Sequence, residues 1–120
     1  MSGRPTEVRP WGAFEVLYED RECKVKRILV ERGKRVSYQT HAQRAEHWLI
    51  VSGTGEVTLD GVRSPVSAGS AVDVPHGCAH RIENTGAEKL VFVEVQHGGT
   101  YFGEDDIVRI DDDFGRVEPS

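Results

Sequence analysis

The chain has 120 residues, of which 38% are hydrophobic and 29% are charged, with a formal net charge of −5 at pH 7. A chain of this length forms one domain around one core, and its scattered basic residues and few aromatic residues exclude the charge pattern of a nucleic-acid binder. No apolar run could span a bilayer and the amino terminus lacks a secretion signal, so we expect no nucleic-acid partner, no membrane partner and a cytoplasmic location.

The two cysteines, Cys23 and Cys78, lie far apart and show no paired spacing. This usage is typical of reduced thiols in a reducing compartment rather than of a disulfide framework. Cys78 stands beside polar residues of interest, but a free cysteine commonly behaves as a small hydrophobic residue. We therefore interpret Cys78 as a buried core residue.

The first half of the chain reads as a series of strands. Residues 13–20 and 23–31 alternate apolar and polar side chains, and a turn follows at Gly33. Residues 47–62 predict a strand, a glycine-marked bend and a second strand that closes on the dipeptide Asp60-Gly61. That dipeptide is a strong signal for a hairpin.

The second half continues the pattern. Residues 70–74 predict a short strand that Pro75 stops, and residues 80–86 lead through a turn to an apolar strand over residues 89–96. No segment shows a helical period beyond a turn or two. Seven or eight short strands separated by turns predict an all-β sandwich or a closed jelly-roll barrel.

Polar residues interrupt this pattern where an apolar strand begins. Gln39 and His41 are two residues apart and share a face, as do Glu46, Trp48 and Ile50 on the next strand. If Trp48 and Ile50 point into the core, Glu46 does too. A buried carboxylate is costly unless it is neutralised, and the neighbouring imidazole and amide oxygen suit a divalent cation. The pattern indicates a metal site.

The same reasoning makes His80 a candidate ligand, because it begins a strand on which Ile82 shares its face. A histidine at a strand end is more often a surface residue or a satisfied core group, and His41 or His80 alone would favour that interpretation. The spacing of these residues relative to the glycines around them favours metal binding instead. It reads G-x5-Q-x-H-x4-E-x6-G over residues 33–53 and G-x5-P-x-G-x2-H-x3-N over residues 69–84.

These two patterns resemble the paired motifs of the cupin superfamily. Gln39 stands where most cupins have a histidine, and the resulting set resembles the ligands of phosphomannose isomerases. The resemblance implies four metal ligands: Gln39, His41, Glu46 and His80.

The resemblance extends over nearly the whole chain, to the mannose-6-phosphate isomerase type II domain that is often fused behind a mannose-1-phosphate guanylyltransferase. The chain differs from that family at two places: in the link "AQR", where family members often have histidines, and in the segment "QHGGTY", which is slightly longer than usual. No phosphate-cradling glycine loop is present, so we expect a stand-alone domain without guanylyl transfer. The matching fragments are "RPWGAFEVL", "YEDRECKVKRILV", "RAEHWLIVSGTGEVTL", "VPHGCAHRIENTG", "VEVQ" and "YFGEDDIVRIDDDFGR".

The resemblance implies an all-β cupin, a double-stranded β-helix or jelly-roll barrel, as a single domain over residues 1–120. We expect an N-terminal arm (residues 1–12), a barrel (residues 13–97) and an acidic C-terminal segment (residues 98–120) packed near the barrel mouth. Trp11 and Gly12 are expected to cover the barrel or a dimer contact. Small cupins commonly dimerise, which implies a homodimer.

The ligand set of nitrogen and oxygen atoms suits zinc, and also manganese, iron or nickel; the resemblance favours zinc. It implies an aldose-ketose isomerase, an intramolecular oxidoreductase, that interconverts mannose 6-phosphate and fructose 6-phosphate. In such an enzyme a Lewis-acid metal polarises the sugar carbonyl while a base moves a proton between carbons 1 and 2. The candidates for that base are Glu94, Lys26 and His47.

The substrate phosphate needs local cations in an acidic protein. Arg81 lies next to a candidate ligand, and Arg109 and Arg116 lie in the acidic C-terminal segment, which composition alone would assign to a solvated tail. All three are candidates for phosphate binding.

Three other functions stay open at this point. A sugar-binding or sugar-phosphate-binding cupin would keep the ligands without turnover. A cupin oxygenase would need iron, and Gln39 argues against it. A purely structural domain would bind no metal, and a buried Glu46 argues against that.

Overall fold

The computed structural model describes residues 6–99 and 107–115. Over these residues the chain forms eleven strands, more than the seven or eight expected. No helix in the described part is long and apolar enough to cross a membrane. The strands are β1 (Thr6–Arg9), β2 (Gly12–Glu19), β3 (Cys23–Val30), β4 (Tyr38–His41), β5 (Ala45–Ser52), β6 (Thr54–Leu59), β7 (Val62–Ser67), β8 (Ala71–Val74), β9 (His80–Asn84), β10 (Leu90–His97) and β11 (Ile107–Asp111).

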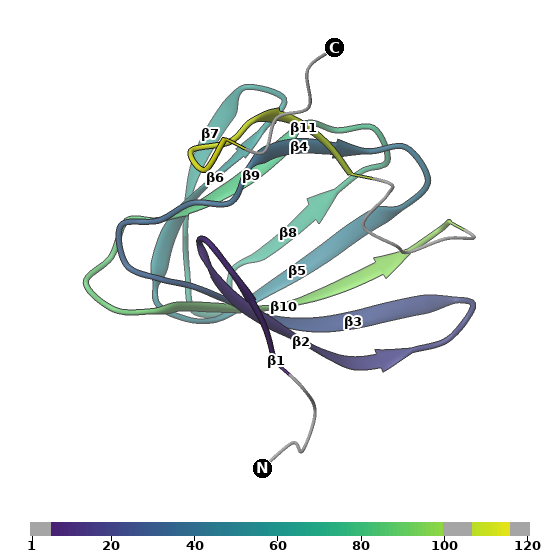
Figure 1. The fold of residues 1–120 in the computed structure, drawn as a ribbon, viewed down its shortest axis with the longest axis horizontal. Coiled ribbons are helices and arrows are strands. Elements are labelled where there is room, and N and C mark those ends of the chain that lie inside the picture. Colours follow the sequence, from purple (N-terminus) through teal and green to yellow (C-terminus); the bar gives the residue numbers. More distant parts are fainter. Residues whose placement is uncertain (1–5, 100–106, 116–120) are drawn as a thin grey trace.

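The strands form two antiparallel sheets that face each other across one interior (Figure 1). The larger sheet has the order β1-β2-β3-β10-β5-β8, and the smaller sheet has the order β11-β4-β9-β6-β7. Strands that are distant in sequence are neighbours in both sheets, as where β10 lies between β3 and β5. The expected all-β barrel is confirmed.

Side chains on β5 alternate between the interior and the surface, as the sequence predicted. Glu46, Trp48 and Ile50 are buried, whereas His47 and Leu49 are exposed. The indole of Trp48 packs against the ring of Phe92 on β10, with ring centroids 5.0 Å apart. The inward face of β5 therefore carries a carboxylate directly beside the aromatic core.

The two sheets extend beyond the expected barrel boundaries at both ends. β1 belongs to the segment expected as an arm (residues 1–12), yet it pairs with β2. β11 belongs to the acidic C-terminal segment (residues 98–120) and pairs with β4. Both are edge strands with little apolar pattern, so alternation gave no signal for them. The rest of these segments, residues 1–5, 100–106 and 116–120, lies outside the described residues.

The hairpin predicted at Asp60-Gly61 is confirmed. Leu59 pairs with Val62 across a two-residue turn, and Asp60 and Gly61 have φ angles of 46° and 82°. Positive φ at both central residues is the requirement of a type I′ turn. This turn joins β6 to β7 in the smaller sheet.

We expect Gly61→Ala to lower the free energy of unfolding by about 1–2 kcal/mol, the cost of a side chain in the left-handed region. Urea denaturation measures the change, and the exposed Ser64→Ala on β7 is the control, with a change within about 0.5 kcal/mol. Equal stability of Gly61→Ala and the wild type would contradict the turn assignment.

Candidate metal centre

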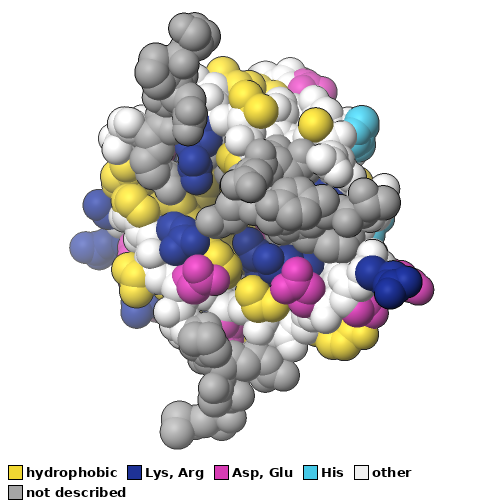
Figure 2. Space-filling view, turned by 45° about the vertical axis from the view of Figure 1, so that its right-hand side comes forward, with side chains coloured by type: hydrophobic (Ala, Val, Ile, Leu, Met, Phe, Trp, Pro, Cys, Tyr) yellow, Lys and Arg dark blue, Asp and Glu magenta, His cyan; other side chains and the backbone are white. Residues whose placement is uncertain are grey.

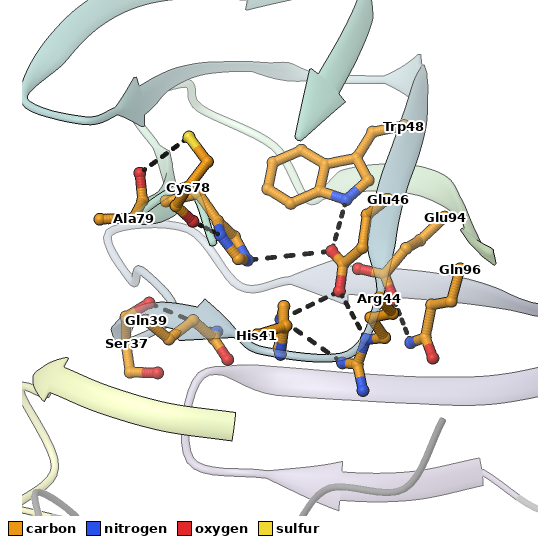
Figure 3. Close-up of polar contacts among 11 residues, drawn as sticks. Ser37, Gln39, His41, Arg44, Glu46, Trp48, Cys78, Ala79, Glu94 and Gln96 are labelled. Atoms are coloured by element: carbon orange, nitrogen blue, oxygen red, sulfur yellow. Dashed lines mark hydrogen bonds and ion pairs between the residues drawn. The ribbon is translucent and has the colours of Figure 1, made fainter. Parts of the chain in front are cut away.

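The four candidate ligands come from three strands on both sheets and line one pocket; Gln39, His41 and Glu46 are labelled in Figure 3. Gln39 and His41 lie on β4, Glu46 lies on β5, and His80 begins β9, where it pairs with Gln39. His41, Glu46 and His80 are 3%, 3% and 2% exposed. The barrel thus brings together the residues that the sequence proposed as one site.

The donor atoms of the two histidines and the glutamate have spacings that suit one ion. His41 Nε2 lies 3.0 Å from Glu46 Oε2, and His80 Nε2 lies 3.9 Å from Glu46 Oε1. Ligands of one zinc ion lie about 3–4 Å apart, because each bond is about 2.1 Å long. Each of these residues offers a ligand atom within 4.8 Å of the others. The cluster therefore fits a divalent metal.

The second ring nitrogen of His80 supports this fit. His80 Nδ1 lies 2.9 Å from the carbonyl oxygen of Cys78. A metal-binding histidine usually donates its other ring N–H to such a group, which fixes the tautomer and turns the free nitrogen toward the ion. In His80 this contact turns Nε2 toward Glu46. Cys78 itself is buried and free, as expected of a core residue.

Gln39 lines the same pocket as the three other candidates. Its side-chain Nε2 donates to the carbonyl oxygen of Ser37 at 3.4 Å. The amide oxygen is therefore the atom that could bind an ion.

Glu46 accepts further hydrogen bonds from two buried groups. Arg44 Nε donates to Glu46 Oε2 at 3.1 Å, and Trp48 Nε1 donates to Glu46 Oε1 at 3.0 Å. Arg44 also approaches His41 Nε2 at 3.4 Å. Sequence reasoning missed Arg44, which lies just before β5 and two residues before Glu46.

The electrostatics of the cluster keep Glu46 ionised. Burial raises the pKa of Glu46, but the hydrogen bond and charge of His41, together with Glu94 and His80, outweigh burial and hold this pKa well below its usual range. Burial lowers the pKa of His80. An ionised carboxylate is the protonation state that a metal requires of Glu46 as a ligand.

Glu94 and Lys26 face the same pocket from neighbouring strands. They pair across β10 and β3, and each is 6% exposed. Glu94 Oε2 accepts a hydrogen bond from Gln96 Nε2 at 2.7 Å. Burial, and then the neighbouring Glu46 carboxylate, raise the pKa of Glu94 to about 8. The Lys26 ammonium lies 4.0 Å from the centre of the Phe14 ring.

The third candidate base, His47, is not in the pocket. It lies on the outer face of β5, where Nδ1 contacts a carboxylate oxygen of the exposed Asp73. Strand alternation is the cause, because Glu46 next to it faces inward. We therefore no longer consider His47 for proton transfer.

Of the candidate phosphate-binding arginines, the structure places one in the pocket. Arg109 lines the pocket from β11, opposite Gln39, and its Nε is buried without a hydrogen-bond partner among the described residues. Arg116 lies outside the described residues. Arg9, which sequence reasoning missed, also lines the pocket from the end of β1.

Arg81 does not reach this pocket. It points outward because His80, its neighbour on β9, points inward. Its Nε donates to the carbonyl oxygen of Val36 at 3.1 Å, and it lines a different hollow on the smaller sheet. Arg81 therefore does not lie at the proposed phosphate position.

The pocket has a volume of about 70 Å³, enough for an ion and several waters. Trp11 and Phe14 contribute apolar walls. Of the two positions expected for Trp11, over the barrel or at a dimer contact, the structure shows the first. On the face shown in Figure 2, lysine and arginine side chains gather near the centre of the molecule. The acidic chain thus presents a local group of cations.

A family model described as "Mannose-6-phosphate isomerase C-terminal" matches residues 3–112. The chain belongs to this family. The resemblance drawn from the spacing of Gln39, His41, Glu46 and His80 is thereby confirmed at the level of the family.

Two curated relatives show what such domains are part of. The xanthan biosynthesis protein XanB of Xanthomonas campestris pv. campestris is 44% identical over 109 residues, which cover 91% of this chain and 23% of that protein. A mannose-1-phosphate guanylyltransferase of Escherichia coli is 44% identical over 108 residues, which cover 90% and 23%. The chain therefore spans about a quarter of the length of these relatives.

Solved structures show the same fold. The capsular polysaccharide assembling protein CapF of Staphylococcus aureus superposes with a TM-score of 0.77 at 23% identity, over 90% of this chain and 34% of that chain. The cupin domain of Schizosaccharomyces pombe Cnp3 gives a TM-score of 0.71 at 18% identity, over 73% and 65%. The expected cupin fold is confirmed.

We expect the wild-type chain to bind one divalent metal ion, and Glu46→Gln to weaken that binding by about 100-fold or more, because the site loses its only carboxylate ligand. Metal content after dialysis and isothermal titration with zinc measure the effect. His47→Ala is the matched control and keeps wild-type affinity, since its side chain faces outward. Equal zinc affinity of Glu46→Gln and the wild type would contradict the site.

Proposed function

We propose that the chain is a divalent-metal-dependent aldose-ketose isomerase that interconverts mannose 6-phosphate and fructose 6-phosphate. The supporting observation is that one pocket combines the His41, Glu46 and His80 cluster with a buried carboxylate, Glu94, and a cation, Arg109. These are the three groups that isomerisation of a sugar phosphate needs. Membership of the mannose-6-phosphate isomerase C-terminal family supports the choice of sugar.

Gln39, His41, Glu46 and His80 would hold the metal, and zinc is the proposed ion because its ligands are imidazole nitrogen and carboxylate or amide oxygen. When bound, a divalent metal supplies Lewis-acid polarisation of the sugar carbonyl. Arg44 and Trp48 hold the Glu46 carboxylate in place through its two oxygens. The chain's own hydrogen bonds therefore fix the ligand before an ion arrives.

Glu94 is the proposed base for proton transfer between carbons 1 and 2. Above its pKa of about 8 Glu94 is a carboxylate and accepts the proton from carbon 2 of mannose 6-phosphate, while a water molecule gives a proton to the carbonyl oxygen on carbon 1. Glu94 then returns the proton to carbon 1, and the hydroxyl on carbon 2 gives its proton back to the deprotonated water as the ketone forms. Gln96 orients Glu94 through their 2.7 Å hydrogen bond, and Lys26 provides the nearby positive charge.

Arg109 is proposed to bind the substrate phosphate, with Arg9 as a second cation. Arg109 lines the pocket, and its buried Nε has no hydrogen-bond partner within residues 6–99 and 107–115. Arginine binds phosphate through charge-assisted hydrogen bonds. Trp11 and Phe14 of the hydrophobic core line the same pocket as these two cations.

A sugar-phosphate-binding cupin without turnover is the second candidate. The contact of Arg44 with Glu46 favours it, because the carboxylate is neutralised even without a metal. Metal and phosphosugar binding without any interconversion of the two hexose phosphates would select this candidate.

We expect the wild type to convert mannose 6-phosphate to fructose 6-phosphate, and Glu94→Gln to lower kcat by about 10²–10⁴-fold, the usual contribution of a general base. A coupled assay for fructose 6-phosphate measures turnover, and zinc affinity shows whether the site is intact. The exposed Glu88→Gln is the control and keeps wild-type kcat. Full activity of Glu94→Gln would assign proton transfer to another group.

We expect Arg109→Ala to raise KM for mannose 6-phosphate by about 10-fold or more with little change in kcat, because a hydrogen bond to a charged group contributes about 1.5–3 kcal/mol. Steady-state kinetics at constant ionic strength measure both constants. Arg63→Ala, an exposed arginine on β7, is the control. An unchanged KM in Arg109→Ala would place the phosphate elsewhere.

A further inference from the structure

β11 carries Arg109 and, among the strands of the described residues, has one neighbour. It lies at the edge of the smaller sheet and pairs with β4. An edge strand with a single partner has half of its backbone hydrogen-bonding groups unpaired by the sheet. Side-chain contacts must therefore contribute to its position.

A bulge in β11 divides its side chains between two faces. Arg109 pairs with Gln39, whereas Asp111 pairs with Tyr38, the next residue along β4, so Ile110 is an extra residue in the ladder. Residues that pair across strands share a face, and an extra residue reverses the alternation. Arg109 thus faces the pocket while Asp111 faces the outer surface.

On the outer surface, two arginines of the barrel bind this strand and the turn after it. Arg35 Nε and one terminal nitrogen each lie 2.8 Å from an oxygen of Asp113, in a bidentate pair. Arg81 donates to Asp111 Oδ2 at 3.2 Å, and Arg35 lies 4.0 Å from the same carboxylate. We name these four residues, Arg35, Arg81, Asp111 and Asp113, the arginine clamp.

The geometry of the clamp indicates order rather than a loose surface contact. Arg81 has a side chain 10% exposed and is fixed by its hydrogen bond to Val36. Bidentate pairing and linked charges are the arrangements in which ion pairs near a surface contribute to stability. Phe114, directly after Asp113, packs against the core and so also holds the segment after β11 to the barrel.

The clamp also reduces the negative electrostatic potential near the proposed phosphate position. The run Asp111, Asp112 and Asp113 begins two residues after Arg109, and negative charges near a phosphate site repel an incoming phosphate. Arg35 and Arg81 neutralise two of them. The positive charge of Arg109 can then act on the pocket.

We propose that the arginine clamp is a positioning device: it holds β11 against β4 so that Arg109 faces the pocket and binds the phosphate group of the substrate. Arg81 and Arg35 thus serve phosphate binding through β11 and do not touch the phosphate. The role of Arg109 in this inference rests on the proposed function, whereas the attachment of β11 does not.

The test compares Asp113→Ala with the double swap Arg35→Asp, Asp113→Arg. Two readouts need no turnover: hydrogen exchange of the β11 amides, and titration of the metal-loaded chain with inorganic phosphate. We expect Asp113→Ala to speed exchange at β11 by about 10-fold or more and to weaken phosphate binding several-fold, raising KM for mannose 6-phosphate without lowering kcat. The swap restores both. Glu56→Ala breaks the comparable pair with Arg63 on the same sheet and changes neither.

Unchanged exchange at β11 in Asp113→Ala would overturn the clamp. Faster exchange with wild-type phosphate affinity would overturn its link to Arg109. If the wild type itself binds no phosphate, the proposed phosphate site fails, and the exchange data alone then decide whether the clamp holds β11.

Discussion

The burial of the Glu46 carboxylate is the constraint on which the rest of the pocket depends. An ionised carboxylate inside a barrel is costly unless cations and hydrogen-bond donors surround it. Here His41, Arg44 and Trp48 contact its two oxygens. The hydrogen bond and charge of His41 help to hold the pKa of Glu46 well below its usual range. Burial, and then the charge of Glu46, raise the pKa of the second buried carboxylate, Glu94. The two buried carboxylates of one cavity thereby have pKa values shifted in opposite directions, that of Glu46 downward and that of Glu94 upward.

Strand alternation divides the polar residues between this cavity and the surface. On β5 and β9, Glu46 and His80 face inward, while His47 and Arg81 face outward and pair with aspartates. On β11 a bulge produces the same division between Arg109 and Asp111. The inward residues form the candidate site. The outward arginines hold the edge strand that completes it.

The sequence predicted the parts of this arrangement that depend on local periodicity and spacing. The alternation of Glu46, Trp48 and Ile50 and the hairpin at Asp60-Gly61 followed from the residues alone. The family followed from the resemblance of the sequence motifs to those of known proteins. Alternation could not choose between Glu94 and Lys26, because the register of β3 against β10 places both in the pocket. It could not find β1 or β11, whose mostly exposed edge positions carry little apolar pattern, or the outward direction of Asp111, which depends on a bulge. Zinc, a cytoplasmic location and a homodimer stay predictions.

The most direct test of the metal-dependent phosphosugar site is an anomalous-diffraction crystal structure of the metal-loaded chain with a hexose 6-phosphate bound. We expect one metal ion bonded to His41, Glu46 and His80, the sugar carbons 1 and 2 beside Glu94, and the phosphate against Arg109. A metal bound outside this cluster, or a sugar whose reacting carbons lie away from Glu94, would contradict the proposed isomerase.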